Sequence, residues 1–229
     1  MNTSNHQAGL YGLNQQGLVN SADFAWIHPG VLEDLRGLAS AATQAGFQLA
    51  VYSGYRDFHR QSLIWNHKWQ GLRPILDQHS HPISLAELSD EQKMHAILRW
   101  SALPGTSRHH WGTDFDLYDP QLLPAGSSLA LIPQEYEAGG CQHSFACWLE
   151  QHAKSYGFFF PYQRFQGGVE FEPWHLSHLA CSQIKLSGLE TDTLLSHLRQ
   201  AQVAGFTTIE QHIEQIFEQY VRNICLPES

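Results

Sequence analysis

The stretch SRHHWGTDFD, residues 107–116, joins a histidine-containing loop to the start of an alternating segment. The letters TDFDLYD, residues 113–119, alternate between polar and apolar side chains, which predicts a half-buried strand. His109 precedes this strand, and Asp116 lies on it. Gly112 allows the loop to turn back so that the imidazole and the carboxylate converge, and both groups are ordinary zinc ligands. Taken alone, the segment also fits a solvated polar loop before a strand.

The segment EPWH, residues 172–175, places a carboxylate and an imidazole three residues apart. Pro173 biases Glu172 toward extended backbone. If a turn begins at Pro173, Glu172 takes the cap position and His175 lies close to it in the same turn. A Glu-x-x-His pair on its own is more often structural. Only in combination with the first segment does this pair indicate a functional site rather than a structural role.

Together the two segments supply two histidines, one aspartate and one additional glutamate. A catalytic zinc site needs three protein ligands and an open fourth position, and a hydrolase also needs a base that is not a ligand. A structural zinc site usually has four ligands and is rich in cysteine, and no cysteine lies next to these motifs. Three candidate ligands and one additional carboxylate therefore favour a hydrolytic metal site.

Working outward, the hydrophobic periodicity predicts a mixed fold. Helices are expected at 28–46, 57–71, 89–103, 141–157, 190–203 and 207–223, and extended segments at 47–53, 113–119, 157–163 and 169–175. Helices and strands do not alternate in a regular βαβ rhythm, which favours an α+β fold with a small antiparallel sheet flanked by helices. We expect an irregular N-terminal arm over 1–28, a central domain over 29–185, and a helical C-terminal extension over 186–229 packed on the same domain.

Composition limits the classes of partner. The chain has 229 residues, a net charge of -9 and no Lys/Arg stripe, so neither nucleic acid nor anionic lipid is an expected partner. No apolar run reaches the roughly 18 residues of a membrane span. The N-terminus lacks a secretory signal, which predicts a cytoplasmic location unless a leader was removed, in which case the periplasm or cell envelope is expected. The sequence does not indicate an oligomeric state.

The four cysteines form no Cys-x-x-Cys pair. We expect buried or unreactive thiols, and a disulfide between Cys141 and Cys147 stays open at this stage. No cysteine lies in a recognisable nucleophile motif, which argues against a thiol enzyme.

The motifs resemble those of the VanY/VanX D-alanyl-D-alanine peptidase family. Residues 107–116 are similar to its Ser-x-His-x-x-Gly-x-x-x-Asp motif, and residues 172–175 to its Glu-x-Trp-His motif. SGYRD, residues 53–57, followed by Gln61, resembles the Tyr-Arg substrate segment of the family. The resemblance implies the Hedgehog/DD-peptidase fold. It also implies a zinc-dependent carboxypeptidase that removes the terminal D-Ala of peptidoglycan peptides.

The resemblance implies a role for each matching residue. His109, Asp116 and His175 match the zinc ligands, and Glu172 matches the catalytic base. Arg56 matches the arginine that stabilises the oxyanion or binds substrate. Positions that line the substrate cleft, or are expected beside it, are Ser107, Gln61, Tyr55 and Trp174.

The chain departs from the family pattern at one notable position. Asp114 stands where the family usually has a small residue, so it is either a partner of a ligand or an alternative ligand. His110 and His178, next to or near the expected ligands, are ambiguous in the same way.

Two other functions remain open from the sequence. One is a related enzyme, an LD-carboxypeptidase or an L-Ala-D-Glu endopeptidase. The other is a non-catalytic module that binds cell-wall peptides, although an intact Glu172 argues against it.

Overall fold

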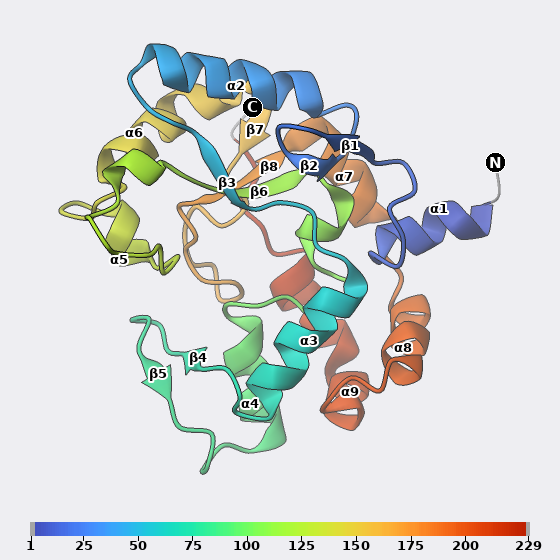
Figure 1. Ribbon diagram of the computed structural model, residues 1–229. Coiled ribbons are helices and arrows are strands. Elements are labelled where there is room, and N and C mark those ends of the chain that lie inside the picture. The colour runs from blue at the N-terminus through green and yellow to red at the C-terminus, as the bar shows by residue number, and fades with distance from the viewer. Residues whose placement is uncertain (1–2, 228–229) are drawn as a thin grey trace.

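The computed structural model describes residues 3–227 (Figure 1). A four-stranded antiparallel sheet lies at its centre, in the order β3–β6–β8–β7. The strands are β3 (Ala50–Ser53), β6 (Asp114–Tyr118), β7 (Phe158–Phe159) and β8 (His175–His178). Because the chain combines this small antiparallel sheet with many helices, the predicted α+β class is confirmed.

The register between β6 and β8 separates a core face from a functional face. Phe115 pairs with Leu176, and Asp116 pairs with His175. Because successive side chains of a strand point to opposite faces, the apolar pair and the polar pair face opposite sides of the sheet. The alternation in TDFDLYD therefore places two of the expected ligands on one face.

Two helices cover the core face. They are α2 (Leu32–Gln44) and α6 (His143–His152), which lie beside the sheet in Figure 1. Leu35 of α2 and Phe145 of α6 are fully buried in one cluster with Phe115 and Leu176. These contacts fix the back of the sheet, so the opposite face is left for the polar side chains.

A second apolar core lies among helices from distant parts of the chain. It joins α3 (Phe58–Trp69) and α4 (Asp90–Leu98) to α8 (Thr191–Gln200) and α9 (Phe206–Ile216). The helix starts agree with the sequence signals: Asp57 caps α3, and Ser89 forms a capping box with Gln92 at α4. The C-terminal helices share this core with α3 and α4 (Figure 1).

The N-terminal segment differs from the irregular arm that we expected. The structure has a helix, α1 (Thr3–Leu10), and a short hairpin of β1 (Val19–Ser21) and β2 (Ala25–Ile27). Ile27 is buried in the sheet core, and the next residue, His28, donates its backbone N–H to the carbonyl of Gly112 at 2.9 Å. These distant contacts stabilise a segment whose own sequence carries weak signals; residues 1–2 of the expected arm lie outside the described residues.

The remaining elements are short connections and one unexpected helix. They are β4 (Ile75–Leu76), β5 (Pro82–Ile83), the 3₁₀ turns η1 (Arg108–Trp111), η2 (Pro120–Leu122) and η3 (Ala153–Tyr156), α5 (Pro133–Tyr136), α7 (Leu179–Ser187) and the π-helical turn η4 (Phe217–Val221). The sequence analysis assigned no helix to the residues of α7 and no strand to those of the β4–β5 hairpin. Between residues 3 and 227, no helix has the length and apolarity to cross a bilayer. All four cysteines are free, so the disulfide left open above does not form.

Candidate metal centre and catalytic pocket

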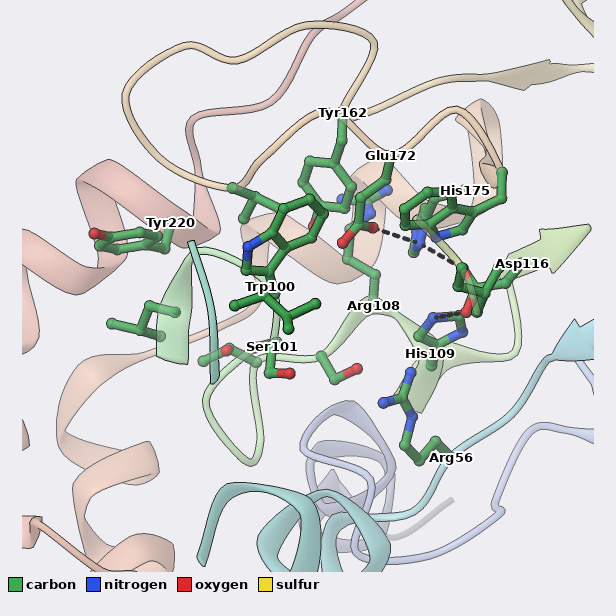
Figure 2. A pocket seen from close by; sticks show the side chains of 18 of the residues that line it. Arg56, Trp100, Ser101, Arg108, His109, Asp116, Tyr162, Glu172, His175 and Tyr220 are labelled. Carbon is green, nitrogen blue, oxygen red and sulfur yellow. Dashed lines mark ion pairs between the residues drawn. The ribbon is translucent and has the colours of Figure 1, made fainter. Parts of the chain in front are cut away.

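Three buried side chains from two motifs meet at one point. His109 comes from η1, Asp116 from β6 and His175 from β8, and their ligand atoms all lie within 4.8 Å of one another. Nε2 of His109 is 3.3 Å from Oδ2 of Asp116, and Nδ1 of His175 is 3.1 Å from Oδ1 of the same carboxylate. Figure 2 shows both rings directed at the carboxylate. We call these three residues the metal-ligand cluster.

Local backbone geometry brings the cluster together. Gly112 ends η1 with φ of 63°, and a Cβ atom there would lie 2.9 Å from the backbone nitrogen of His28. Only glycine fits this left-handed, crowded position, so the loop can return His109 to the strand. At the second motif, the backbone N–H of His175 donates to the carbonyl of Glu172 at 3.1 Å, which closes the turn expected at Pro173.

A single residue holds the outer nitrogens of both histidines. Nδ1 of His109 lies 3.2 Å from the backbone carbonyl oxygen of Asp114, and Nε2 of His175 lies 3.1 Å from its carboxylate. Both acceptors require the histidine nitrogen facing them to carry a proton. The other two ring nitrogens, Nε2 of His109 and Nδ1 of His175, therefore point toward the cluster. Metal-binding histidines commonly have this arrangement, in which a hydrogen bond to one ring nitrogen orients the other toward the metal.

Asp114 itself is anchored away from the cluster. Its carboxylate accepts from Nε of Arg108 at 2.7 Å and from the hydroxyl of Thr113 at 2.6 Å. Among residues 3–227, the group with metal-binding geometry does not include Asp114. The structure thus places Asp114 behind His175, as a partner of a candidate ligand.

The two ambiguous histidines also lie outside the cluster. His110 accepts the backbone N–H of Gly105 at 3.0 Å and donates to the carbonyl of Arg56, and burial lowers its pKa to about 3. This neutral ring holds the backbone of Arg56 in place. His178 pairs through Nε2 with Asp34 at 2.9 Å, which ties β8 to α2.

The charge balance of the cluster suits a cation. Burial alone would raise the pKa of Asp116, but His109 and His175 hold it well below its ordinary value. Burial would lower the pKa of His175, yet the neighbouring carboxylates of Asp114 and Asp116 raise it to about 9. Oδ1 of Asp116 is buried and accepts no hydrogen bond, although it is close to His175. A buried, unsatisfied carboxylate oxygen between two ring nitrogens fits a divalent metal.

A carboxyl group and a guanidinium group stand beside the cluster. Oε2 of Glu172 is 3.5 Å from Nδ1 of His175, and burial raises the pKa of Glu172 to about 8. Arg56 lines the same pocket, and its buried Nε has no hydrogen-bond partner among the described residues. Both groups line the pocket beside the cluster, where a bound molecule can reach them (Figure 2).

The structure separates the other expected substrate-binding residues into two sets. Ser107 and Trp174 line the pocket with Arg56. Gln61 and Tyr55 do not: the amide of Gln61 donates to the carbonyl of Ala102 at 2.7 Å, and the Tyr55 hydroxyl lies 3.4 Å from the carbonyl of Asn14.

Several lining residues were missed in the sequence. They are Lys68, Trp100, Ser101, Arg108, Tyr162 and Tyr220. Lys68 follows Gln61 by seven residues on the same helix, but Gln61 does not line the pocket, so this spacing did not indicate the position of Lys68. Tyr220 comes from the C-terminal segment, and no local pattern indicates that it reaches the pocket.

The segment that carries Glu172 is held by the C-terminal tail. The side chain of Gln219 donates to the carbonyl of Gly167 at 2.6 Å, and that of Asn223 donates to the carbonyl of Gln166 at 2.9 Å. The backbone N–H of Cys225 donates to the carbonyl of Pro161 at 2.8 Å. The tail is therefore a structural support of the loop before Glu172.

Comparison with known proteins agrees with this geometry. A model of the family described as VanY D-alanyl-D-alanine carboxypeptidase matches residues 25–181. The chain belongs to this family. The matched residues include the whole metal-ligand cluster, Glu172 and Arg56, and they end before α8 and α9. The VanY-family chain is thus a member of a peptidase family.

Relatives and solved structures are similar over different shares of the VanY-family chain. An uncharacterized protein of Haemophilus influenzae is 35% identical over 121 residues, which cover 52% of this chain and 92% of that protein. The structure of VanYB in complex with D-alanine-D-alanine has a TM-score of 0.51 and 24% identity, and covers 80% of this chain and 87% of its own. The LdcB LD-carboxypeptidase has a TM-score of 0.51 and 21% identity, with 79% and 78% covered. These structures share the fold.

Replacing Asp114 with asparagine is expected to weaken zinc binding about 10- to 100-fold, which is typical for loss of a partner of a metal-binding histidine. The carboxylate that fixes the orientation of His175 is removed, while the backbone acceptor of His109 remains. Competition with a chromogenic chelator measures the affinity. Asp192→Asn, at an exposed position of α8, is the matched control. An unchanged affinity in Asp114→Asn would contradict this role.

Proposed function

We propose that the chain is a zinc-dependent carboxypeptidase that hydrolyses the terminal D-Ala of peptidoglycan peptides ending in D-Ala-D-Ala. The observation that carries the proposal is one buried cluster of two histidines and an aspartate, with Glu172 beside it in the same pocket. Family membership supports the peptidase activity. The complex of the structural neighbour VanYB with D-alanine-D-alanine supports the choice of substrate.

Zinc is the proposed metal because of the donor set. Two imidazole nitrogens and one carboxylate are the ligands of many catalytic zinc sites, which leave one position open. Among the described residues, the group has three members and no cysteine, so it lacks the fourth ligand of a closed structural site. When bound, zinc supplies Lewis acidity, which polarises a peptide carbonyl and makes a water molecule more acidic.

The residues of the chain supply the proton transfers. Glu172 takes a proton from the attacking water and later gives it to the leaving amine of the terminal residue. Burial, which raises the pKa of Glu172, makes its carboxylate a stronger base than one in water. A cation in the cluster favours the ionised form of this carboxylate, so that the base is in the state that accepts a proton.

In this proposal, Arg56 stabilises negative charge on the carbonyl oxygen. Its backbone N–H donates to the carbonyl of His109 at 3.1 Å, and its own carbonyl accepts from His110. These bonds fix the start of the side chain. A preorganised cation in a buried pocket is worth more to a developing oxyanion than one in water.

A digest of purified muropeptides tests the proposal. Zinc-loaded protein is expected to remove one terminal D-Ala from the pentapeptide, because the base and the metal cluster face the same pocket, and a chelator should abolish the reaction. Mass spectrometry of the products measures the cut. Restored activity on adding zinc back separates metal removal from unfolding.

The same digest separates the rival cuts. Loss of D-Ala from the tetrapeptide would replace the proposal with LD-carboxypeptidase activity, which the shared fold with LdcB makes the natural second candidate. An internal cut would indicate an endopeptidase. No cleavage by zinc-loaded protein would contradict the proposed function and favour a peptide-binding module.

A further inference from the structure

The pocket extends beyond the metal-ligand cluster toward the C-terminal segment. Lys68 of α3, Ser101 just after α4, and Tyr220 and Val221 of η4 line it together with Glu172. In the view of Figure 2, Ser101 lies between Tyr220 and the cluster. This part of the pocket combines α3 and α4 with a segment that lies outside the family match. Lys68 and Ser101 themselves lie within the matched residues, whereas Tyr220 and Val221 lie beyond them.

Lys68 brings into this part of the pocket a positive charge that has no direct ion-pair partner among residues 3–227. Its Nζ donates to the hydroxyl of Ser101 at 2.7 Å. No carboxylate in residues 3–227 lies within 4.0 Å of this nitrogen, although the chain carries 22 acidic residues against 13 basic ones. Lys93, by contrast, has an acidic partner in Asp90, with Nζ and Oδ1 3.4 Å apart. Burial lowers the pKa of Lys68 to about 8.

The charge of Lys68 is directed toward the catalytic end of the pocket. After the cost of burial, the strongest influence on Lys68 is the negative charge of Glu172, and Lys68 in turn favours the ionised form of Glu172. Arg56 lies just before α3 and Lys68 near the C-terminal end of this helix, and both side chains line the same pocket.

Burying an ammonium group without a counter-charge is costly, and such groups in native proteins are usually paired. The hydroxyl of Ser101 accepts from Lys68, which leaves its own proton free for a further acceptor. An ammonium and a hydroxyl side by side match the two oxygens of a carboxylate. Tyr220 and Val221 close this end of the pocket with apolar surface, which strengthens the interaction by excluding water.

We propose that Lys68 and Ser101 form a subsite that binds a carboxylate of the peptide substrate. The subsite rests on the proposed peptidase function and adds a substrate feature that the metal-ligand cluster does not read. The carboxylate has two possible sources: the free C-terminus of the peptide, or the side chain of an acidic residue near the scissile bond.

Three peptides distinguish these sources. The first is an N-acetylated peptide ending in diaminopimelate-D-Ala-D-Ala, the second is its C-terminal amide, and the third has lysine in place of diaminopimelate, which removes one carboxylate. Isothermal titration calorimetry measures the affinity of each peptide for two zinc-loaded proteins: the Glu172→Gln variant, and the same variant that also carries Lys68→Met. Because the peptides need not be cleaved, the measurement stands even if the proposed function fails.

Lys68→Met is expected to weaken binding of the first peptide about 10- to 100-fold, the value of a charge-assisted hydrogen bond in a closed site. The peptide that lacks the recognised carboxylate should change by less than about twofold, because nothing is left for Lys68 to bind. If Lys68→Met leaves the affinity for the C-terminal amide unchanged, the subsite binds the terminal carboxylate. If it leaves the affinity for the lysine peptide unchanged, the subsite binds the side-chain carboxylate. Lys68→Arg should restore part of the affinity.

Two controls separate binding from folding. Lys185→Met on α7, outside the pocket, should leave all affinities unchanged. Ser101→Ala should weaken the same peptide in the same direction, by a smaller factor. An equal loss for all three peptides, no loss for any, or no binding of any peptide to the Glu172→Gln protein would overturn the subsite. In the wild-type protein, absence of any cleavage would count against the proposed peptidase alone.

Discussion

Replacing Glu172 with glutamine is expected to abolish peptide cleavage while zinc content stays at the wild-type level. The amide has nearly the same shape as the carboxylate, but it cannot accept the proton of the attacking water. Loss of a positioned general base costs about 10²- to 10⁴-fold in rate. Initial rates on the pentapeptide and metal content by mass spectrometry are the two measurements, made on the same preparation.

A control variant at a distant glutamate tests whether the loss of activity is specific to Glu172. Glu150→Gln, on the exposed side of α6, should change neither activity nor zinc content. Loss of zinc from the Glu172 variant would show that this carboxylate is a ligand. Retained activity would mean that another group is the base, and the assignment of Glu172 would be wrong.

Replacing Asp116 with asparagine is expected to release the metal. This side chain presents one oxygen to each histidine of the cluster, at 3.3 and 3.1 Å, and it is the only carboxylate of the group found among the described residues. The loss of affinity should exceed the 10- to 100-fold expected for Asp114→Asn, which removes a partner of a ligand. Chelator competition on both variants gives the ranking.

The order of the two aspartate variants decides the ligand assignment. If Asp116→Asn kept zinc while Asp114→Asn lost it, Asp114 would be the ligand and the geometry described above would be misassigned. Circular dichroism of both variants is the control for folding, because Asp114 also neutralises Arg108 in the interior. Removing one partner of such a buried pair costs about 3–5 kcal/mol of stability, so some destabilisation of Asp114→Asn is expected.

Predictions from the sequence were correct where neighbouring residues determine the local structure. The alternation in TDFDLYD predicted β6 and placed Asp116 opposite the core-facing Phe115, and the glycine after η1 predicted the return of His109 toward the strand. The caps of α3 and α4 were also readable from single residues. These features depend on neighbours in the sequence, so the chain alone contains them.

The features that the sequence did not reveal depend on distant contacts. The hairpin at 19–27 is stabilised by a hydrogen bond from the next residue to Gly112 and by packing against the sheet core. Tyr220 reaches the pocket because α9 packs on α3 and α4. Asp114 could not be assigned either, since its role depends on the pairing of β6 with β8 and on Arg108. Periodicity does not carry such information.

The bonds from Gln219, Asn223 and Cys225 to the loop before Glu172 have a consequence for the timing of synthesis. On the ribosome, the N-terminal parts of a chain emerge first and can begin to fold while the rest is being made. The three residues of the metal-ligand cluster are all translated before these supports exist. A nascent chain can therefore gather its metal ligands early, but the loop carrying the base is secured only after position 225 has left the exit tunnel. The supports of this loop should accordingly be complete only once residues 219–225 have been translated and have folded against it.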